Sequence, residues 1–398
     1  MQKGKNLLFL KDTFLLGITA FGGPQAHIAM MLQQFVLKRN YITEEELMEA
    51  LAFSSILPGP SSTQTLLTIA MKRGGTLLAV LSLLVWVLPA AILMTALTLA
   101  FTLFEARGFS LEFLLFVQPM AIGIILFAAF RIGRAVIKNT YGVVILVIAL
   151  VFTVFFNSPL VFPIALFAGG FITNISNRHI LPPLKTRLPI DWKKSSFNLF
   201  LLILILVGAA VAGAVTKHRS VVIFENFLRF GSITFGGGSV LVPMMFEQFV
   251  KHRQYLTANE FISGYALNQA IPGPAFAFAT FTGGMSLKEF GLNYQVLGCF
   301  LGTIGIFLPG ALIVFFLYPL WEYLKSYRFI QRSLEGINAA ATGMVLGAAA
   351  ILFTNLEFHL INIFVIIATF CLLQFTKLQT PILVFLGLIA GFVYTRFF

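Results

Sequence analysis

Charged residues are scarce in this 398-residue chain. Only 11% of its residues are charged, whereas 58% are hydrophobic and the mean hydropathy is +0.92. A soluble domain carries about 25% charged residues, so the composition argues against a soluble protein. The 45 Phe and 33 Gly are typical of packed membrane helices. We therefore predict a polytopic membrane protein.

The residues that most enzymes and metal centres require are also few. The two cysteines, Cys299 and Cys371, lie far apart in apolar stretches, so they indicate neither a disulfide framework nor a metal site. None of the five histidines is paired at metal-ligand spacing, and P-loop, HExxH, CxxC and Gly-x-Ser-x-Gly motifs are absent. We expect no enzyme activity, no catalytic residues, no metal and no cofactor. Any pumping without an ATP site must use an ion gradient or the membrane potential.

The net charge of +12 has a topological explanation. The basic residues cluster in short gaps between apolar runs, where the positive-inside rule places them. We interpret them as topology signals and expect no nucleic-acid partner. Residues 1–5 are short and basic, and the apolar stretch after them continues past a Gly-Gly-Pro break. We therefore expect the first hydrophobic segment to be retained rather than cleaved as a signal.

Apolar runs follow one another along the whole chain, and most reach the length of about 20 residues that a bilayer-spanning helix needs. Two runs in each half are interrupted at their centres by Gly and Pro. The interruptions are Phe21-Gly22-Gly23-Pro24 and Leu57-Pro58-Gly59-Pro60, then Phe235-Gly236-Gly237-Gly238 and Ile271-Pro272-Gly273-Pro274. The sequence leaves open whether these broken segments span the membrane or re-enter it.

The interruptions belong to an internal repeat. With a constant offset of 214, residues 17–60 align with residues 231–274 without a gap, and 17 of the 44 positions are identical. Further along, an offset of 220 pairs Leu88-Pro89 with Leu308-Pro309. We predict two related repeat domains, 1–195 and 221–398, joined by a transmembrane helix within 196–220.

The orientation of the halves follows from the number of crossings. The run at 197–215 has no counterpart in the repeat, so the number of crossings between equivalent points is odd and the halves should be inverted. With the N-terminus inside, most basic gaps fall on the cytoplasmic side, although Lys217/Arg219 and Lys251/Arg253 do not. The predicted fold class is an all-α polytopic membrane protein, with two homologous halves in an inverted-repeat arrangement and broken or re-entrant helices.

Helices broken at corresponding positions of inverted repeats indicate a transporter binding site near the bilayer midplane. The first N–H groups of a helix lack intrahelical partners, and the positive end of the helix dipole lies there, so each break is suited to an anion. Irregular backbone cannot face lipid, so the four breaks could converge on one central site. The alternative is that the glycines allow close helix packing and the hydroxyl groups bond to their own helices. The predicted substrate-binding residues are Gly22, Gly23, Pro24, Gln25, His27, Pro58, Gly59, Pro60, Ser61, Ser62, Thr63, Gln64, Gly236, Gly237, Gly238, Ser239, Asn268, Gln269, Pro272, Gly273 and Pro274.

Several other polar or aromatic residues have two interpretations each. His27 could sense pH or donate to the anion, or it could make a structural hydrogen bond. Arg229 could reach the cavity or extend to the membrane interface. Glu46 and Glu260 are repeat-equivalent, and the Thr-x-x-Glu pattern around each favours a helix-capping box over proton coupling. Trp86 is interpreted as packing.

The interrupted motifs at 21–27, 57–64, 235–238 and 272–274 resemble those of the chromate ion transporter family in its long, two-domain form. The resemblance covers nearly the whole chain. It implies export of chromate from the bacterial cytoplasm across the inner membrane, hence chromate resistance, with sulfate as an isosteric competitor. Many members have Gln before the first Pro-Gly-Pro, where this chain has Ser55, while the second half keeps Gln269.

We therefore expect a transporter that exports chromate, or a similar tetrahedral oxyanion, driven by the membrane potential. One alternative is a proton-coupled importer of sulfate or another anion. Another is an anion channel whose broken helices form a selectivity filter. The expected partners are a small inorganic oxyanion and the lipid bilayer, and formation of a homo-oligomer is left open.

Overall fold

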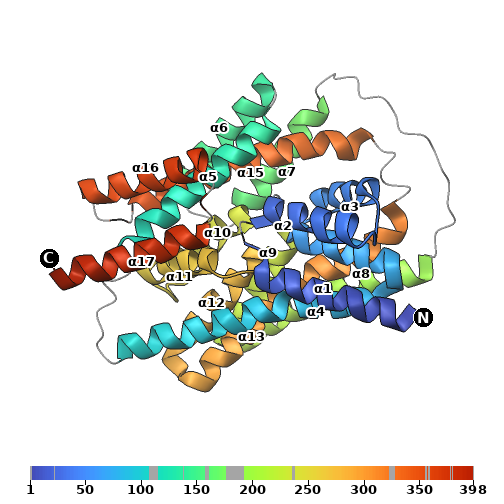
Figure 1. The fold of residues 1–398 in the computed structure, drawn as a ribbon, viewed down its shortest axis with the longest axis horizontal. Helices are drawn as coiled ribbons and strands as arrows, with labels where there is room; N and C mark the ends of the chain where they lie inside the picture. The colour runs from blue at the N-terminus through green and yellow to red at the C-terminus, as the bar shows by residue number, and fades with distance from the viewer. Residues whose placement is uncertain are drawn as a thin grey trace.

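The computed structural model describes residues 2–21, 23–106, 115–137, 139–156, 161–175, 192–234, 238–321, 328–354, 356, 359–376, 378 and 380–397. Regular structure in these ranges is helical, with no strand, which confirms the predicted all-α class. Figure 1 shows the helices, with the two termini at opposite ends of the longest axis.

The helices fall into two similar series with one helix between them. The first series is α1 (Gln2–Thr19), α2 (Gly23–Met31), π-helix η1 (Leu32–Lys38), α3 (Glu44–Ile56), α4 (Ser61–Ala106), α5 (Val117–Val136), α6 (Thr140–Phe155) and α7 (Val161–Ile175). The second is α9 (Arg219–Ile233), α10 (Gly238–Phe246), π-helix η3 (Glu247–His252), α11 (Ala258–Ala270), η4 (Ala275–Ala277), α12 (Phe278–Met285), η5 (Lys288–Phe290), α13 (Leu292–Leu317), η6 (Tyr318–Leu320), α15 (Arg328–Thr354), α16 (Leu360–Phe375) and α17 (Thr380–Phe397). Helix α8 (Trp192–Thr216) lies between the series and matches the run without a counterpart at 197–215.

The sequence repeat is a structural repeat in its details. Both series contain a π-helix at the same point, followed by a left-handed residue, Asn40 at φ 50° and Gln254 at φ 52°. Both predicted capping boxes are confirmed, because the Thr43 and Glu46 pair and the Thr257 and Glu260 pair each make the two reciprocal hydrogen bonds. The two halves therefore adopt the same local structure from equivalent residues.

The first broken segment of each half is a hairpin. Asp12, in α1, pairs with Arg39 just past η1 at 2.9 Å, and Phe9 packs on Phe35 with ring centroids 5.0 Å apart. The chain therefore turns back between α1 and α2 and returns to the end from which it started. The second half repeats the arrangement, with Asn226 bonded to Gln248 at 3.1 Å.

The second broken segment of each half is also a hairpin. Glu46 at the start of α3 pairs with Lys72 at 2.9 Å, and the equivalent Glu260 pairs with Lys288. These ion pairs join the open ends of the hairpins, so each Pro-Gly-Pro lies at a closed tip. Each broken segment therefore folds back on itself instead of continuing straight.

Helix α4 consists of two segments that meet at Gly74 and Gly75, where the backbone leaves the helical region. The Trp86 indole N–H donates to Thr63 Oγ1 at 3.1 Å. A straight helix would separate residues 23 positions apart by about 35 Å, so the segment after Gly75 folds back along the hairpin. Beyond Trp86 it continues to Ala106 as a long apolar helix.

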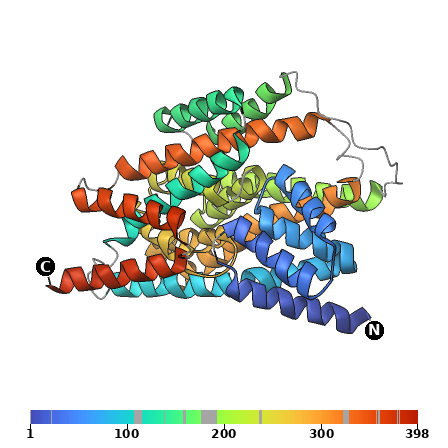
Figure 2. The same cartoon turned by 45° about the horizontal axis from the view of Figure 1, so that its top comes forward.

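Within the described ranges, four helical stretches are long and apolar enough to cross a membrane: Ser61–Glu105, Ser196–Thr216, Leu292–Leu320 and Glu335–Thr354. Shorter apolar helices include Thr140–Phe155 and Leu360–Phe375. The two halves interlock, because α15 packs on α6 and α7 while its counterpart α5 packs on α16 and α17. Figure 2 shows α15, in orange, beside these green helices of the first half.

Candidate functional site

The hairpins are joined in two pairs across the two halves. The Gly59 N–H donates to the Thr234 carbonyl at 2.7 Å, and the Gly273 N–H donates to the Ala20 carbonyl at 2.8 Å. Ala20 and Thr234 are repeat-equivalent and follow the last residues of α1 and α9, while Gly59 and Gly273 are the central glycines of the Pro-Gly-Pro motifs. Each Pro-Gly-Pro turn is therefore bonded to the residue that follows the first helix of the other half, and the two bonds are reciprocal.

Both central glycines occupy positions that only glycine tolerates. Gly59 has φ +121° and Gly273 has φ +116°, which side chains of L-residues rarely adopt. A Cβ on Gly273 would lie 2.6 Å from the Ala90 Cβ, and one on Gly59 would lie 2.8 Å from the Gln64 amide nitrogen. The tips are therefore tightly packed as well as sharply turned.

Two predicted amide side chains stabilise the Pro-Gly-Pro turns. Gln64 Nε2 donates to the Pro58 carbonyl at 2.6 Å, and Asn268 Nδ2 donates to the Ala275 carbonyl at 3.1 Å. The two residues are not repeat-equivalent, so each half closes its turn with a different side chain. Their side-chain oxygens are buried and have no hydrogen-bond partner within the described ranges. These amides lie at the tips as predicted, and their N–H groups hold the backbone there.

A buried polar cluster joins the starts of α2 and α4. His27 Nδ1 lies 3.1 Å from Ser62 Oγ, and the His27 ring meets Trp86 edge-on with centroids 5.2 Å apart. Trp86 in turn donates to Thr63. From the sequence, Trp86 was interpreted only as packing. It lies in an apolar run, and nothing there indicates that its indole nitrogen bonds to Thr63, 23 residues earlier.

Each hairpin tip is also the start of a helix. The arms that leave the tips begin with α2 at Gly23, α4 at Ser61, α10 at Gly238, and η4 at Ala275 followed by α12. The first N–H groups of each helix lack intrahelical acceptors, and the positive end of the helix dipole lies there. The carbonyls of Ala20 and Thr234, which close the preceding arms, already accept hydrogen bonds. The arrangement therefore offers backbone donors without a fixed positive charge, which suits an anion.

The remaining predicted site residues divide into two groups. Pro24, Pro60, Ser61, Gln269, Pro272 and Pro274 lie in or next to the tips. Gly22, Gly236 and Gly237 fall outside the described residues, and so do the side chains of Gln25 and Ser239.

Two of the charged residues with an open interpretation are engaged elsewhere. Arg229 is bonded to Glu225 and Asn226 on its own helix. The Thr43 backbone N–H and the Lys72 ammonium hold the pKa of Glu46 below its usual value. A carboxylate that stays ionised near neutral pH is poorly suited to carrying a proton, so the capping interpretation of Glu46 is the stronger one.

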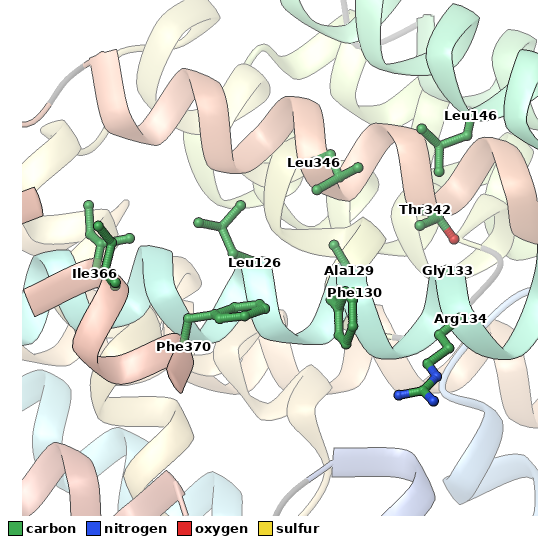
Figure 3. Close-up of a pocket in the computed structure, with 11 residues that line it drawn as sticks. Leu126, Ala129, Phe130, Gly133, Arg134, Leu146, Thr342, Leu346, Ile366 and Phe370 are labelled. Carbon is green, nitrogen blue, oxygen red and sulfur yellow. The ribbon is translucent and has the colours of Figure 1, made fainter. Parts of the chain in front are cut away.

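One cavity away from the tips is apolar. It measures about 560 Å³ and lies between α5, α6, α15 and α16, as Figure 3 shows. Its walls carry aliphatic and aromatic side chains such as Leu126, Phe130 and Phe370, with Arg134 near one end. Such a lining offers little to a hydrated dianion, so we place the candidate site at the tips instead.

Helices of this length and apolarity, arranged in two interlocked halves, define a multi-pass membrane protein. The sequence matches the family described as "Chromate transporter" over residues 7–173 and 221–392, once in each half. The chain belongs to the chromate transporter family.

Its relatives agree with this assignment. It is 27% identical to a "Chromate transport protein" of Pseudomonas aeruginosa, over 84% of this chain and 78% of that protein. It is 26% identical to a "Probable chromate transport protein" of Synechococcus elongatus, over 95% of this chain and 93% of that one. The "Uncharacterized transporter YwrB" of Bacillus subtilis is 28% identical over 41% of this chain and 87% of its own length, so it matches about one half. No solved structure matches the fold.

Proposed function

We propose that this protein exports chromate from the bacterial cytoplasm across the inner membrane, driven by the membrane potential. The observation that carries the proposal is the meeting of the hairpin tips. Four helix starts surround two Pro-Gly-Pro turns that are bonded reciprocally across the halves. Family membership supports chromate as the substrate, and the tetrahedral dianion sulfate is its nearest competitor by shape and charge.

The site would bind the dianion with neutral donors. Backbone N–H groups near Gly23–Gln25, Ser61–Thr63, Gly238–Ser239 and Ala275–Phe276 are the expected ligands, assisted by the hydroxyls of Ser61 and Ser62. Proline has no N–H, so Pro60 and Pro274 would shape the helix starts while the residues after them bind. A hydrogen bond to a charged group is worth about 1.5–3 kcal/mol, and a few of them are sufficient for a transported ligand that must also be released.

We further propose that the halves, 1–195 and 221–398, are inverted in the membrane and joined by the helix within 196–220. The contacts between two equivalent helices support this. Gln295, near the start of α13, donates to Thr102 near the end of α4 at 2.6 Å, whereas Gly310 lies beside Gly59 and Pro60. Equivalent helices that run antiparallel are related by an axis perpendicular to them. With hairpins that enter from opposite faces, the site at the tips could be exposed alternately to the two sides of the membrane.

The membrane potential is sufficient to drive export. Each negative charge that leaves an inside-negative cell gains about 2.3 kcal/mol per 100 mV. A dianion therefore gains about 4.6 kcal/mol per 100 mV by the same relation. The ionised state of Glu46 supports a mechanism that does not require a proton on that carboxylate.

Chromate uptake into inverted membrane vesicles tests the proposal, with empty vesicles as the control. We expect saturable uptake that sulfate inhibits, that stops when the potential is collapsed, and that persists when only the pH gradient is collapsed. Dependence on the pH gradient at zero potential would favour the proton-coupled importer. Large conductance without saturation or counterflow would favour the channel, and either result contradicts potential-driven export by a carrier.

A further inference from the structure

A basic pocket lies at the open end of the first half's hairpins, away from the tips. It measures about 590 Å³, and its lining includes three basic residues, Lys5, Lys72 and Arg73, with Glu46 as the one acid among its lining residues. Tyr41, Asn6 and Ile42 complete the lining. The pocket thus carries a formal excess of two positive charges.

The fold holds one of these cations firmly in place. The Arg73 guanidinium lies 4.2 Å from the centroid of the Tyr41 ring and 5.3 Å from that of Phe9, and it donates to the Tyr41 carbonyl at 2.9 Å. Its Nε is buried without a hydrogen-bond partner in the part of the chain that the structure describes. Lys72 is fixed by Glu46, whereas Lys5 is exposed beside them. Arg73 and Lys5 are therefore the cations with donors to spare.

The equivalent residues of the second half have the opposite charge balance. Lys5 and Tyr41 correspond to Arg219 and Tyr255 at the offset of 214. Lys72 and Arg73 correspond to Lys288 and Glu289 at an offset of 216, which also aligns the left-handed Gly75 and Gly291. At one of these positions the first half therefore has the cation Arg73, whereas the second half has the anion Glu289.

That replacement neutralises the cations of the second half. Arg219 covers the Tyr255 ring at 3.9 Å, as Arg73 covers Tyr41, but it is bonded to Glu289 at 2.6 Å. Lys288 contacts Glu260 and also Glu105, which α4 contributes from the first half. Two cations therefore face three carboxylates here, whereas the lining of the first-half pocket has three cations and one carboxylate, with Glu49 also acting on Lys72 from nearby.

The two clusters lie at opposite ends of one helix. Arg73 precedes the long segment of α4, and Glu105 is near its end. The roughly 30 residues between them span about 45 Å at 1.5 Å per residue, which exceeds the hydrocarbon thickness of about 30 Å. Figure 1 shows α4 extending along the molecule in this way. A helix of this apolarity therefore places the basic and the acidic cluster on opposite faces of the membrane.

We propose that the basic pocket is a second anion site, a vestibule that binds the oxyanion on one face of the membrane and supplies it to the hairpin tips. Its occupant has the chemistry of a small tetrahedral oxyanion, and its role in supply rests on the function proposed above. A cluster of one sign raises the local concentration of the opposite ion and falls in effect with ionic strength. The acidic cluster of Glu105, Glu260 and Glu289 would repel the anion at the other face. The two halves would therefore differ in how readily they take up the anion, although they share a fold.

The charge pair of the second half provides the test. The double variant Lys5→Arg, Arg73→Glu transfers the Arg219 and Glu289 arrangement to the first half, where the same tyrosine and helix turn already exist. The control Lys11→Gln, Lys38→Gln also lowers the net charge by two, at exposed residues that do not line the pocket. Both proteins are reconstituted in vesicles of phosphatidylcholine alone, with the half-1 pocket facing the added chromate.

We expect the transferred pair to raise the half-saturating chromate concentration about five- to tenfold at low salt, with a maximal rate within about twofold of wild type. The difference should shrink at high ionic strength, where the Debye length falls to about 3 Å at 1 M. An unchanged half-saturating concentration, or the same change in the control, would overturn the proposal. A difference that arises only when phosphatidylglycerol is added would also overturn it, because a lipid headgroup would then be the occupant.

Binding without transport separates this proposal from the function proposed above. Equilibrium dialysis of labelled sulfate and chromate against the purified protein should find two classes of site in the wild type and one in the transferred-pair variant. That result would stand even if the protein moved no chromate. The same two classes in both proteins would refute the vestibule while leaving the tips as the transport site.

Discussion

At the residue scale, the most demanding positions are the two central glycines of the Pro-Gly-Pro tips. Each adopts a positive φ, donates its N–H to the opposite half, and leaves no room for a side chain. Gly291 has a positive φ of +94° as well, but no atom lies within 4 Å of the position that its Cβ would occupy. Gly291 is therefore a matched control: a side chain there strains the backbone but makes no contact at the tips.

We predict that Gly59→Ala and Gly273→Ala weaken chromate or sulfate binding by more than tenfold, whereas Gly291→Ala leaves binding unchanged. All three substitutions impose backbone strain of about 1–3 kcal/mol, so each should lower the thermal unfolding temperature. Only the first two displace the tips. Binding by equilibrium dialysis, together with melting curves in detergent, measures the difference. Equal loss of binding in all three variants would attribute the effect to strain and contradict the assignment.

Sequence reasoning found the tips but not the atoms that join them. The Pro-Gly-Pro and Phe-Gly-Gly motifs marked Gly59 and Gly273, because Gly and Pro interrupt apolar runs visibly. Their partners are the backbone carbonyls of Ala20 and Thr234, and a carbonyl is present at every residue, so no sequence signal distinguishes these two. Trp86 was missed as a hydrogen-bond donor for a related reason, since its partner depends on how the chain folds back at Gly74 and Gly75.

At the element scale, the Pro-Gly-Pro hairpins are joined at their open ends by ion pairs between a capping-box glutamate and a lysine. The repeat and the capping boxes could be predicted from Thr43-x-x-Glu46 and its equivalent. The hairpin fold could not, because an apolar run broken at its centre has the same length whether it continues straight or turns back. Long-range pairs such as Glu46 with Lys72 decide between the two, and the sequence does not show which lysine a glutamate meets.

We predict that Glu46→Gln lowers stability slightly at neutral pH and that this loss shrinks as the pH falls through the lowered pKa of the carboxyl. The Thr43 N–H and the Lys72 ammonium lower the pKa of Glu46 in the folded protein, so its stabilisation is present above the ordinary pKa of the carboxyl and is lost as the pH falls through the lowered value. Gln keeps the capping bond but loses the ion pair, which is partly exposed, so the loss should be about 0.5 kcal/mol. Melting temperatures between pH 3 and pH 7 check this.

The control for that experiment is Glu44→Gln in the same helical turn, where the side chain is exposed. Its melting curves should follow those of the wild type more closely across the range. If Glu46→Gln instead changed transport while its stability matched the wild type at every pH, the carboxylate would have a role in coupling, and the capping interpretation would be insufficient.

At the scale of the whole molecule, the halves are interlocked as well as similar. The tips exchange hydrogen bonds, α5 and α15 each pack on the other half's last helices, and equivalent helices α4 and α13 run antiparallel. A single half lacks the acceptor for its own Pro-Gly-Pro amide, so a half-length relative would need a second copy to complete the same tips. The site, in this view, belongs to the pair of halves rather than to either one.

The proposed inversion of the halves makes a direct prediction about two equivalent residues. Lys38 and His252 are both exposed, and each lies at the end of a π-helix, at the open end of a hairpin. In a background with Cys299 and Cys371 replaced by Ala, single cysteines at these positions should react from opposite sides. With the N-terminus inside, a membrane-impermeant maleimide should label His252→Cys in intact cells, and Lys38→Cys only after permeabilisation. Labelling of both from one side would contradict the inversion. The reverse pattern would keep the inversion but place the basic vestibule outside, and it would then favour import over export.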